Sequence, residues 1–280
     1  MPSAIELTQQ KRYRALYIGH KHSGKTVAAC SHIPADAGKK IYIFDGDGRI
    51  GGILGAKWID RSRIDYDYYP PVGDGNGNLM QRINDKCNIL FQEFKNKSCI
   101  YDTIIADSLT SFAKGLIETS MPYTHAPGAK HASNKIAATN IPGTDDYMYE
   151  SVNTNHIIAA LRSMPAQNVI VTGHIIDKYA KADTKNPYSD MIVVGEKIHL
   201  RDKIWEDIGV YFDNIFRFQR RLVNGEERFF VTFIDNIACT SLPGLKPGEF
   251  DITGQNFQEF LRNQILSASS EKSTGAARGE

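Results

Sequence analysis

A glycine-rich run near the N-terminus constrains this chain more than any other feature. The run fits the pattern G-x-x-x-x-G-K-[ST] without a mismatch, and its residues are Gly19, His20, Lys21, His22, Ser23, Gly24, Lys25 and Thr26. The apolar stretch Ala15–Ile18 precedes it, and Val27–Cys30 can begin a helix after it. A strand, a glycine loop and a helix N-terminus form a phosphate site, because backbone N–H groups and the helix dipole attract negative charge. These flanks favour a phosphate-binding loop over a chance match in a turn.

The loop predicts roles for its individual residues. The whole run is expected to surround a bound nucleotide, with Lys25 reaching the β- and γ-phosphates and the Thr26 hydroxyl binding Mg²⁺. His20 and His22 occupy variable positions of the pattern, where side chains usually point away from the phosphates. We therefore assign neither histidine a catalytic role.

Composition places the chain among ordinary globular proteins. Of its 280 residues, 41% are hydrophobic, and the net charge of +1 means that any nucleic-acid site must be local. No apolar run reaches transmembrane length, and residues 1–14 lack the apolar core of a signal peptide. The four cysteines form no C-x-x-C pair, so neither a zinc site nor a disulfide framework is indicated. We expect a cytoplasmic protein without a membrane association.

Short apolar runs recur between helical stretches. The expected strands are Ala15–Ile18, Ile41–Phe44, Thr103–Ala106, Val169–Thr172, Asn214–Phe218 and Phe229–Ile234. Apolar residues at helical spacing predict helices over Leu79–Phe94 and Asp145–Arg162. This alternation predicts an α/β fold with a mostly parallel central sheet and helices on both faces. Asn224-Gly225 is a hairpin turn signal, so the last two strands are expected to pair antiparallel.

We expect one main domain. It covers residues 13–266, after an N-terminal arm of residues 1–12. Residues 267–280 are small or polar and have no apolar anchor, so they are predicted to be a disordered tail.

A phosphate loop of this kind needs a partner carboxylate. The apolar run Thr103–Ala106 ends in Asp107, and a carboxylate at the end of a neighbouring strand can hold Mg²⁺, usually through water. The alternative is that Asp107 caps the next helix, but Ser108 can cap it equally well. With the phosphate loop present, we favour the metal role for Asp107.

Two further strand ends carry polar residues. Asp45 and Asp47 follow the run Ile41–Phe44, and one of them could orient the attacking water of an ATPase. We assign this role to Asp47, with Asp45 as the competing choice, although Asp-Gly-Asp-Gly is also strong turn chemistry. His174 follows the run Val169–Thr172 and could sense the γ-phosphate. Its alternative is a solvated histidine at a strand end.

The order of these motifs resembles that of the RecA-like P-loop ATPases. It is most similar to phage-encoded ATPases described as AAA-domain or nucleotide-binding proteins, some of them recombination proteins. The matching segments, within residues 13–262, are Gly19–Thr26, Phe44–Asp47, Ile104–Thr110, Val169–His174 and Gly195–Ile215. The resemblance implies that ATP and Mg²⁺ are bound, that Asp107 is the Walker B acid, and that Asp47 stands for the family's catalytic glutamate. By the same resemblance His174 matches the sensor residue, so Asp47, Lys25 and His174 form the expected catalytic set.

Two segments are candidates for contact with single-stranded DNA. Residues 119–144 contain no acid and read as a long mobile loop, with Tyr123, His125, Lys130, His131 and Lys135. Residues 177–190 follow the sensor strand, with Lys178, Tyr179, Lys181, Lys185 and Tyr188. Lysines can follow a phosphate backbone while tyrosines stack on bases. The alternative is that both segments are merely solvated loops.

The sequence thus predicts an ATP-hydrolysing RecA-like phage protein that acts on single-stranded DNA in recombination or annealing. The alternatives are another ATP-driven DNA motor, a nucleotide-dependent switch that binds a protein, and a small-molecule kinase, which fits less well. The resemblance also implies a ring or filament in which a neighbour supplies a cationic finger. The densest basic cluster provides its candidates, which are Arg201, Lys203, Arg217, Arg220 and Arg221.

Overall fold

The computed structural model describes residues 12–70, 78–124, 141–182, 190–233, 245 and 247–276. Its strands are β1 (Tyr13–Gly19), β2 (Lys40–Asp45), β3 (Ile64–Tyr68), β4 (Tyr101–Asp107), β5 (Asn168–Lys181), β6 (Met191–Ile198), β7 (Asn214–Val223), β8 (Glu226–Thr232) and β9 (Glu249–Asp251). Its helices are α2 (Lys25–Cys30), α3 (Leu79–Lys95), α4 (Leu109–Thr124), α5 (Thr144–Ser163), α6 (Asp202–Tyr211) and α7 (Phe257–Ala276). Two 3₁₀ turns, η1 (Ile50–Gly55) and η2 (Arg61–Arg63), lie between β2 and β3.

The strands form a mixed sheet whose centre is parallel. Its order is β3-β2-β4-β5-β1-β7-β8-β9, and β6 pairs with β5 off this path. The six strands from β3 to β7 in this order run parallel, whereas β7–β8, β8–β9 and β5–β6 are antiparallel. The predictions of a mostly parallel sheet and of a late hairpin are therefore confirmed.

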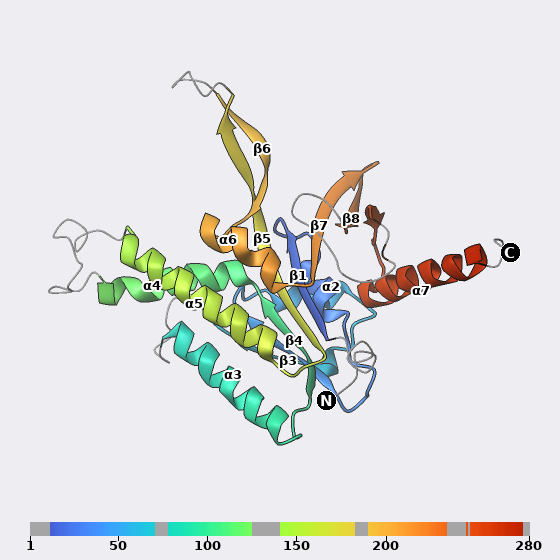
Figure 1. Ribbon diagram of the computed structural model, residues 1–280, viewed down its shortest axis with the longest axis horizontal. Coiled ribbons are helices and arrows are strands. Elements are labelled where there is room, and N and C mark those ends of the chain that lie inside the picture. Colours follow the sequence, from blue (N-terminus) through green and yellow to red (C-terminus); the bar gives the residue numbers. More distant parts are fainter. Residues whose placement is uncertain are drawn as a thin grey trace.

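Helices cover both faces of this sheet. Alternate residues of β1 point to opposite sides, so Leu16 and Ile18 join one core while Ala15 and Tyr17 join the other. The first core includes buried residues of α3, α4, α5 and α6, and the second includes those of α2 and α7 (Figure 1). No helix in the described ranges is long and apolar enough to cross a membrane.

The expected DNA segments are more regular than the sequence suggests. Helix α4 continues to Thr124, so the first residues of the predicted loop 119–144 are helical, and residues 125–140 lie outside the described residues. Strand β5 continues to Lys181 and pairs with β6, so residues 177–181 are not a loop. This pairing supplies the backbone hydrogen bonds of a long hairpin, which extends away from the sheet (Figure 1). Residues 183–189 are not among those described.

The C-terminal segment also differs from its prediction. Helix α7 extends to Ala276, so residues 267–276 are helical rather than disordered, and residues 277–280 fall outside the described part of the chain. The physical reason lies in α7 itself, because Phe257 and Leu261 are buried in the second core and start a helix that Ala, Glu and Lys can continue. Of the expected N-terminal arm, residues 1–11 are likewise not described.

Candidate functional site

The predicted phosphate loop connects β1 to α2 and closes tightly over the end of β1. His22 has φ 61° and Gly24 has φ 91°, left-handed conformations that curl the chain back on itself. A Cβ atom on Gly19 would lie 2.2 Å from the carbonyl oxygen of Phe218 and 2.5 Å from the Ser23 hydroxyl. Only glycine fits this position, and the close approach holds the loop against β7.

Lys25 is the first residue of α2, and its side chain turns back into this loop. Its ammonium group donates to the carbonyl oxygens of Gly19, at 3.0 Å, and of His20, at 2.8 Å. Burial lowers the pKa of Lys25 to about 8, and the negative charges of Asp107 and Asp47 act against that shift. A cation held by main-chain carbonyls inside a glycine loop fits a bound phosphate group, because phosphate oxygens can replace those carbonyl acceptors.

Asp107 faces the loop from the end of β4. Thr26 Oγ1 donates to Asp107 Oδ2 at 2.7 Å, and the Thr172 hydroxyl of β5 donates to the other carboxylate oxygen. Burial raises the pKa of Asp107, and the two hydroxyl donors oppose the shift. A hydroxyl and a carboxylate oxygen so close together fit a Mg²⁺ site, because both are hard oxygen ligands.

Helix capping, the alternative that the sequence left open for Asp107, is performed by its neighbour. The Ser108 hydroxyl accepts from the backbone N–H of Ser111 at 3.3 Å, in the first turn of α4. Thr172 was not predicted as a site residue. A polar residue inside an apolar strand, two residues before His174, was the signal that could have identified it.

The two aspartates at the end of β2 and just after it make different hydrogen bonds. Asp45 Oδ1 accepts from the backbone N–H groups of Asp47, at 3.0 Å, and Gly48, at 2.8 Å, so Asp45 holds the turn. Asp47 instead points at side chains of two neighbouring elements. It accepts from Ser108 Oγ at 2.9 Å and from the Ser111 hydroxyl, and its Oδ2 lies 3.0 Å from His174 Nε2.

Hydrogen bonds keep Asp47 ionised. Burial acts to raise the pKa of Asp47, but the hydrogen bonds from His174 and the two serine hydroxyls outweigh it and bring the pKa well below its ordinary value. An ionised carboxylate can accept a proton or a hydrogen bond from a water molecule. Asp45 thus holds the turn, whereas Asp47 is an ionised carboxylate beside His174.

His174 joins Asp47 to Lys25. Its Nδ1 lies 3.4 Å from Lys25 Nζ, and its Nε2 contacts Asp47. Where the Lys25 ammonium donates to Nδ1, the ring proton is on Nε2 and donates to the carboxylate. The backbone N–H of His174 donates to Thr110 Oγ1 at 3.0 Å, which ties β5 to α4. The predicted catalytic set, Lys25, His174 and Asp47, is therefore one connected chain of side chains.

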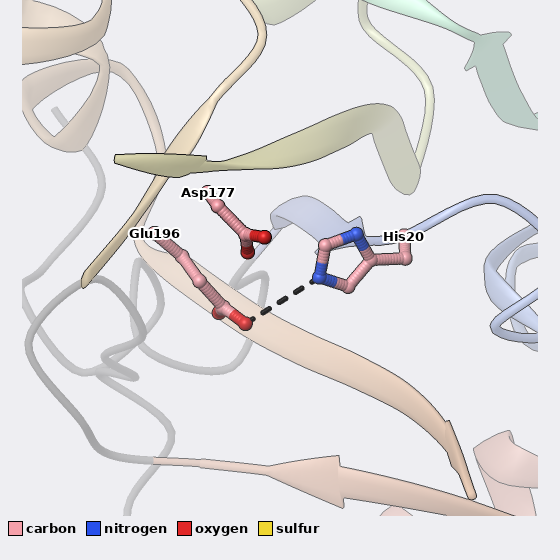
Figure 2. A group of neighbouring side chains, drawn as sticks. All are labelled: His20, Asp177 and Glu196. Atoms are coloured by element: carbon pink, nitrogen blue, oxygen red, sulfur yellow. Dashed lines mark ion pairs between the residues drawn. The ribbon is translucent and has the colours of Figure 1, made fainter. Parts of the chain in front are cut away.

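His20 points away from this chain, as expected for a variable loop position. Its Nε2 lies 3.4 Å from Glu196 Oε1 of β6, and Asp177 of β5 lies beside them (Figure 2). The ligand atoms of these three residues lie within 4.8 Å of one another. Arg217 of β7, however, forms a 2.6 Å ion pair with Glu196, and this cation disfavours a metal ion there. We interpret the group as a polar link from the loop to the β5–β6 hairpin.

The candidate cationic fingers mostly have partners in the same chain. Arg217 pairs with Glu196, Arg220 with Glu227 at 3.2 Å, and Arg221 with Glu249 through two hydrogen bonds. Arg201 lies over the Tyr147 ring, 4.4 Å from its centroid. The side chain of Lys203 lies outside the described residues.

Comparison with known proteins does not place the chain in a family. No protein-family model matches it, and no curated protein is significantly similar to it in sequence. Function is therefore inferred from the site geometry and from the motifs of the chain itself.

Proposed function

We propose that this protein is a RecA-like ATPase that hydrolyses ATP and acts on single-stranded DNA in recombination or annealing. The single observation that carries the ATPase part is the chain Lys25–His174–Asp47, in which three elements bring a phosphate ligand, a sensor and a carboxylate into contact. Bound Mg²⁺ would neutralise charge on the phosphates, held by Thr26 and Asp107. A bare nucleotide-binding switch would not need an ionised carboxylate beside the sensor.

The residues of the chain suggest how hydrolysis would proceed. Lys25 would leave the carbonyls of Gly19 and His20 and bind phosphate oxygens. His174 would then lose its Lys25 contact and become free to respond to the nucleotide, while the serine hydroxyls keep Asp47 in place. Asp47 would accept a hydrogen bond from the attacking water and orient it.

The DNA part of the proposal has separate support. Lys178, Tyr179 and Lys181 are exposed on the β5–β6 hairpin, and Tyr179 is 54% exposed. The first arm of the hairpin is the continuation of β5, the strand that carries His174, so a nucleotide-dependent movement of His174 could reach the lysines and the tyrosine. An exposed aromatic ring between lysines suits stacking on the bases of a single strand.

The decisive experiment measures phosphate release with and without single-stranded DNA. We expect Lys25→Ala to reduce turnover by about 10²-fold or more, because phosphate charge is no longer neutralised. Asp47→Asn should lower turnover by about 10²–10⁴-fold and spare nucleotide binding. Asp45→Asn is the matched control, since an amide oxygen can still accept the two turn hydrogen bonds.

Three results would contradict this assignment. If Asp45→Asn slows hydrolysis more than Asp47→Asn does, the acid has been chosen wrongly. If the wild-type protein binds ATP but releases no phosphate, it is a nucleotide-dependent switch. If phosphate passes to an added small molecule instead of water, it is a kinase.

A further inference from the structure

A cavity of about 960 Å³ lies beside the Asp47–His174 pair. Its walls come from the phosphate loop, the loop after β2, helices α4 and α5, and residues 199–201 before α6. A water molecule fills about 30 Å³, whereas small-molecule pockets have about 300–1,000 Å³. The space is therefore much larger than an attacking water requires, and it can hold a second ligand.

The charge of the walls favours an anion. Two acidic side chains line the cavity, Asp47 and Glu150, against four Lys or Arg side chains, which are Lys21, Arg49, Lys114 and Arg201. Lys114 has a long 3.6 Å contact with Glu118 and remains 73% exposed. The pKa of His199, another lining residue, is lowered by burial and then by nearby positive charges, including those of Lys21 and Lys114. Phosphate is the common biological anion that suits such a cluster.

One acidic group in the wall lacks a partner. Glu150 is 3% exposed, and its Oε2 atom has no hydrogen-bond partner in the described part of the chain. Burial raises the pKa of Glu150 to about 7, with the charge of Arg201 acting in the opposite direction. An unsatisfied buried polar atom costs about 1–3 kcal/mol, and a ligand N–H or O–H group that displaces the atoms now covering Oε2 would relieve that cost.

The neighbouring wall carries a cation and an aromatic ring. The Arg201 guanidinium lies over the Tyr147 ring, 4.4 Å from its centroid, and both residues line the cavity. A guanidinium and a phenol ring are each groups on which an aromatic ring can stack, and the guanidinium can also bind phosphate. Glu150 lies one helical turn after Tyr147 on α5, so the acceptor and the aromatic ring are adjacent.

We propose that this cavity binds one nucleotide unit, with its phosphate on the basic side chains and its base at Tyr147 and Glu150. A nucleotide combines the required groups, namely an anion, a planar ring and an N–H donor. A free nucleoside monophosphate and a nucleotide within a single strand share this chemistry. One part of this proposal rests on the proposed function. If the protein hydrolyses ATP, a ligand bound in the cavity beside Asp47 and His174 would regulate that hydrolysis.

The test measures binding of thymidine monophosphate by calorimetry and of a labelled oligothymidylate by fluorescence anisotropy, both to the full-length protein. We expect Arg201→Ala to weaken binding of the preferred probe at least about tenfold, the loss typical of one charged hydrogen bond. Glu150→Met should weaken it as well and still fold, because it removes a buried unpaired carboxyl. Arg228→Ala is the control, since Arg228 lies outside the cavity and pairs with Glu226 at 2.9 Å.

The two probes distinguish a free nucleotide from a nucleotide within a single strand. Binding of the monophosphate alone, lost in Arg201→Ala, identifies a small-molecule site. Binding of the oligothymidylate, reduced for an abasic oligomer of equal length, identifies a strand whose base enters the cavity. The proposal would be overturned if Arg201→Ala and Glu150→Met bind both probes as tightly as the wild type does. It would also be overturned if the wild type binds neither probe. Phosphate release from ATP is measured in parallel, so its absence counts against the proposed function and not against the cavity.

Discussion

At the scale of single residues, the charge of Lys25 would decide how well the predicted phosphate loop binds an anion. Its pKa of about 8 lies far below the ordinary 10.5, because burial penalises the ammonium form. Bound phosphates would favour that form and raise the pKa again, since opposite charges attract. Phosphate itself completes its ionisation near pH 6, so it does not titrate at higher pH.

We therefore predict that ATP binding takes up about one proton between pH 8 and pH 10. The affinity should be nearly constant just below pH 8 and weaken about tenfold per pH unit above it, because free Lys25 has then lost its proton. Calorimetry in two buffers of different ionisation enthalpy measures the uptake. Lys25→Arg is the control, since a guanidinium stays charged throughout this range. An absence of proton uptake at pH 9 would rule out the lowered pKa.

Asp107 leads to a second prediction at this scale. Asp107→Asn should retain nucleotide binding and lose Mg²⁺-dependent hydrolysis, because the amide keeps the shape and not the charge that faces the metal. The melting temperature should fall by only a few degrees, since the amide oxygen can still accept from one of the two hydroxyls, Thr26 or Thr172. Phosphate release measured over a series of Mg²⁺ concentrations tests this, and wild-type Mg²⁺ dependence would contradict it.

At this scale, the sequence predicted which kinds of side chain lie at the site better than it predicted which contacts each of them makes. The spacing of Gly19–Thr26 and the strand end at Asp107 were enough to predict the loop and its partner carboxylate. The sequence could not show which of Asp45 and Asp47 faces the site, because the two differ only in where their carboxylates point. Asp45 turns back to the backbone of its own turn, whereas Asp47 reaches His174 and the serines of α4, contacts that depend on the packing of β2 against β4.

At the scale of elements, the β5–β6 hairpin contacts the phosphate loop through the Glu196 carboxylate. Glu196 of β6 lies opposite Asp177 in the strand register and contacts both His20 of the loop and Arg217 of β7. Hydrogen bonds and charge from Arg217 lower the pKa of Glu196 against the effect of burial. The carboxylate is thus a shared partner of the loop, the hairpin and the sheet.

We predict that Glu196→Gln loosens the hairpin. Amide hydrogen exchange over residues 175–181 and 191–198 should accelerate, and the free energy of unfolding should fall by about 1 kcal/mol, because a partly buried ion pair is lost. Glu226→Gln on the β7–β8 hairpin is the matched control. Its carboxylate is 70% exposed, so its loss should change stability by less than about 0.5 kcal/mol. Equal effects of the two variants would contradict the link.

Central strands were predicted from the sequence because their apolar runs are buried throughout, whereas β3 and β6 were missed because most of their residues are not buried. The four apolar runs from Ala15 to Thr172 are central parallel strands, buried on both faces, and each was predicted. Strand β3 alternates apolar and acidic residues at the sheet edge, and β6 exposes Met191, Ile192 and Val193. Edge and hairpin strands take their hydrogen bonds from one neighbour, so the pattern of burial that marks a central strand is absent.

At the scale of the whole molecule, the parallel sheet places the site residues at one edge. The register pairs Asp45 with Asp107 and Gly19 with His174, so the carboxyl ends of β1, β2 and β4 meet beside the middle of β5. The meeting of these strand ends follows from the order of the strands in the sheet, which could not be predicted from the sequence. Strand β7, which pairs with β1, carries three arginines of the basic cluster, Arg217, Arg220 and Arg221.

The arginines differ in how firmly their own chain holds them. Arg221 makes two hydrogen bonds with Glu249 and lies over Phe230, whereas Arg220 has a single 3.2 Å contact with the exposed Glu227. Arg220 can therefore exchange its partner for a phosphate of a neighbouring subunit at lower cost. We predict that the protein forms a ring or filament in which Arg220 is the cationic finger, and that turnover per subunit rises with protein concentration.

A mixing experiment tests this assembly. Lys25→Ala and Arg220→Ala should each be inactive alone, since a finger supplied in trans contributes about 10³–10⁵-fold to the rate. In an equal mixture, about one interface in four pairs an intact loop with an intact finger, because the two subunits of a head-to-tail contact contribute different surfaces. The mixture should therefore recover up to about a quarter of wild-type turnover, and Arg221→Ala mixed with Lys25→Ala serves as the control. Concentration-independent turnover by a monomer, established by light scattering under assay conditions, would exclude the shared site, because no neighbour would then be present to complete it.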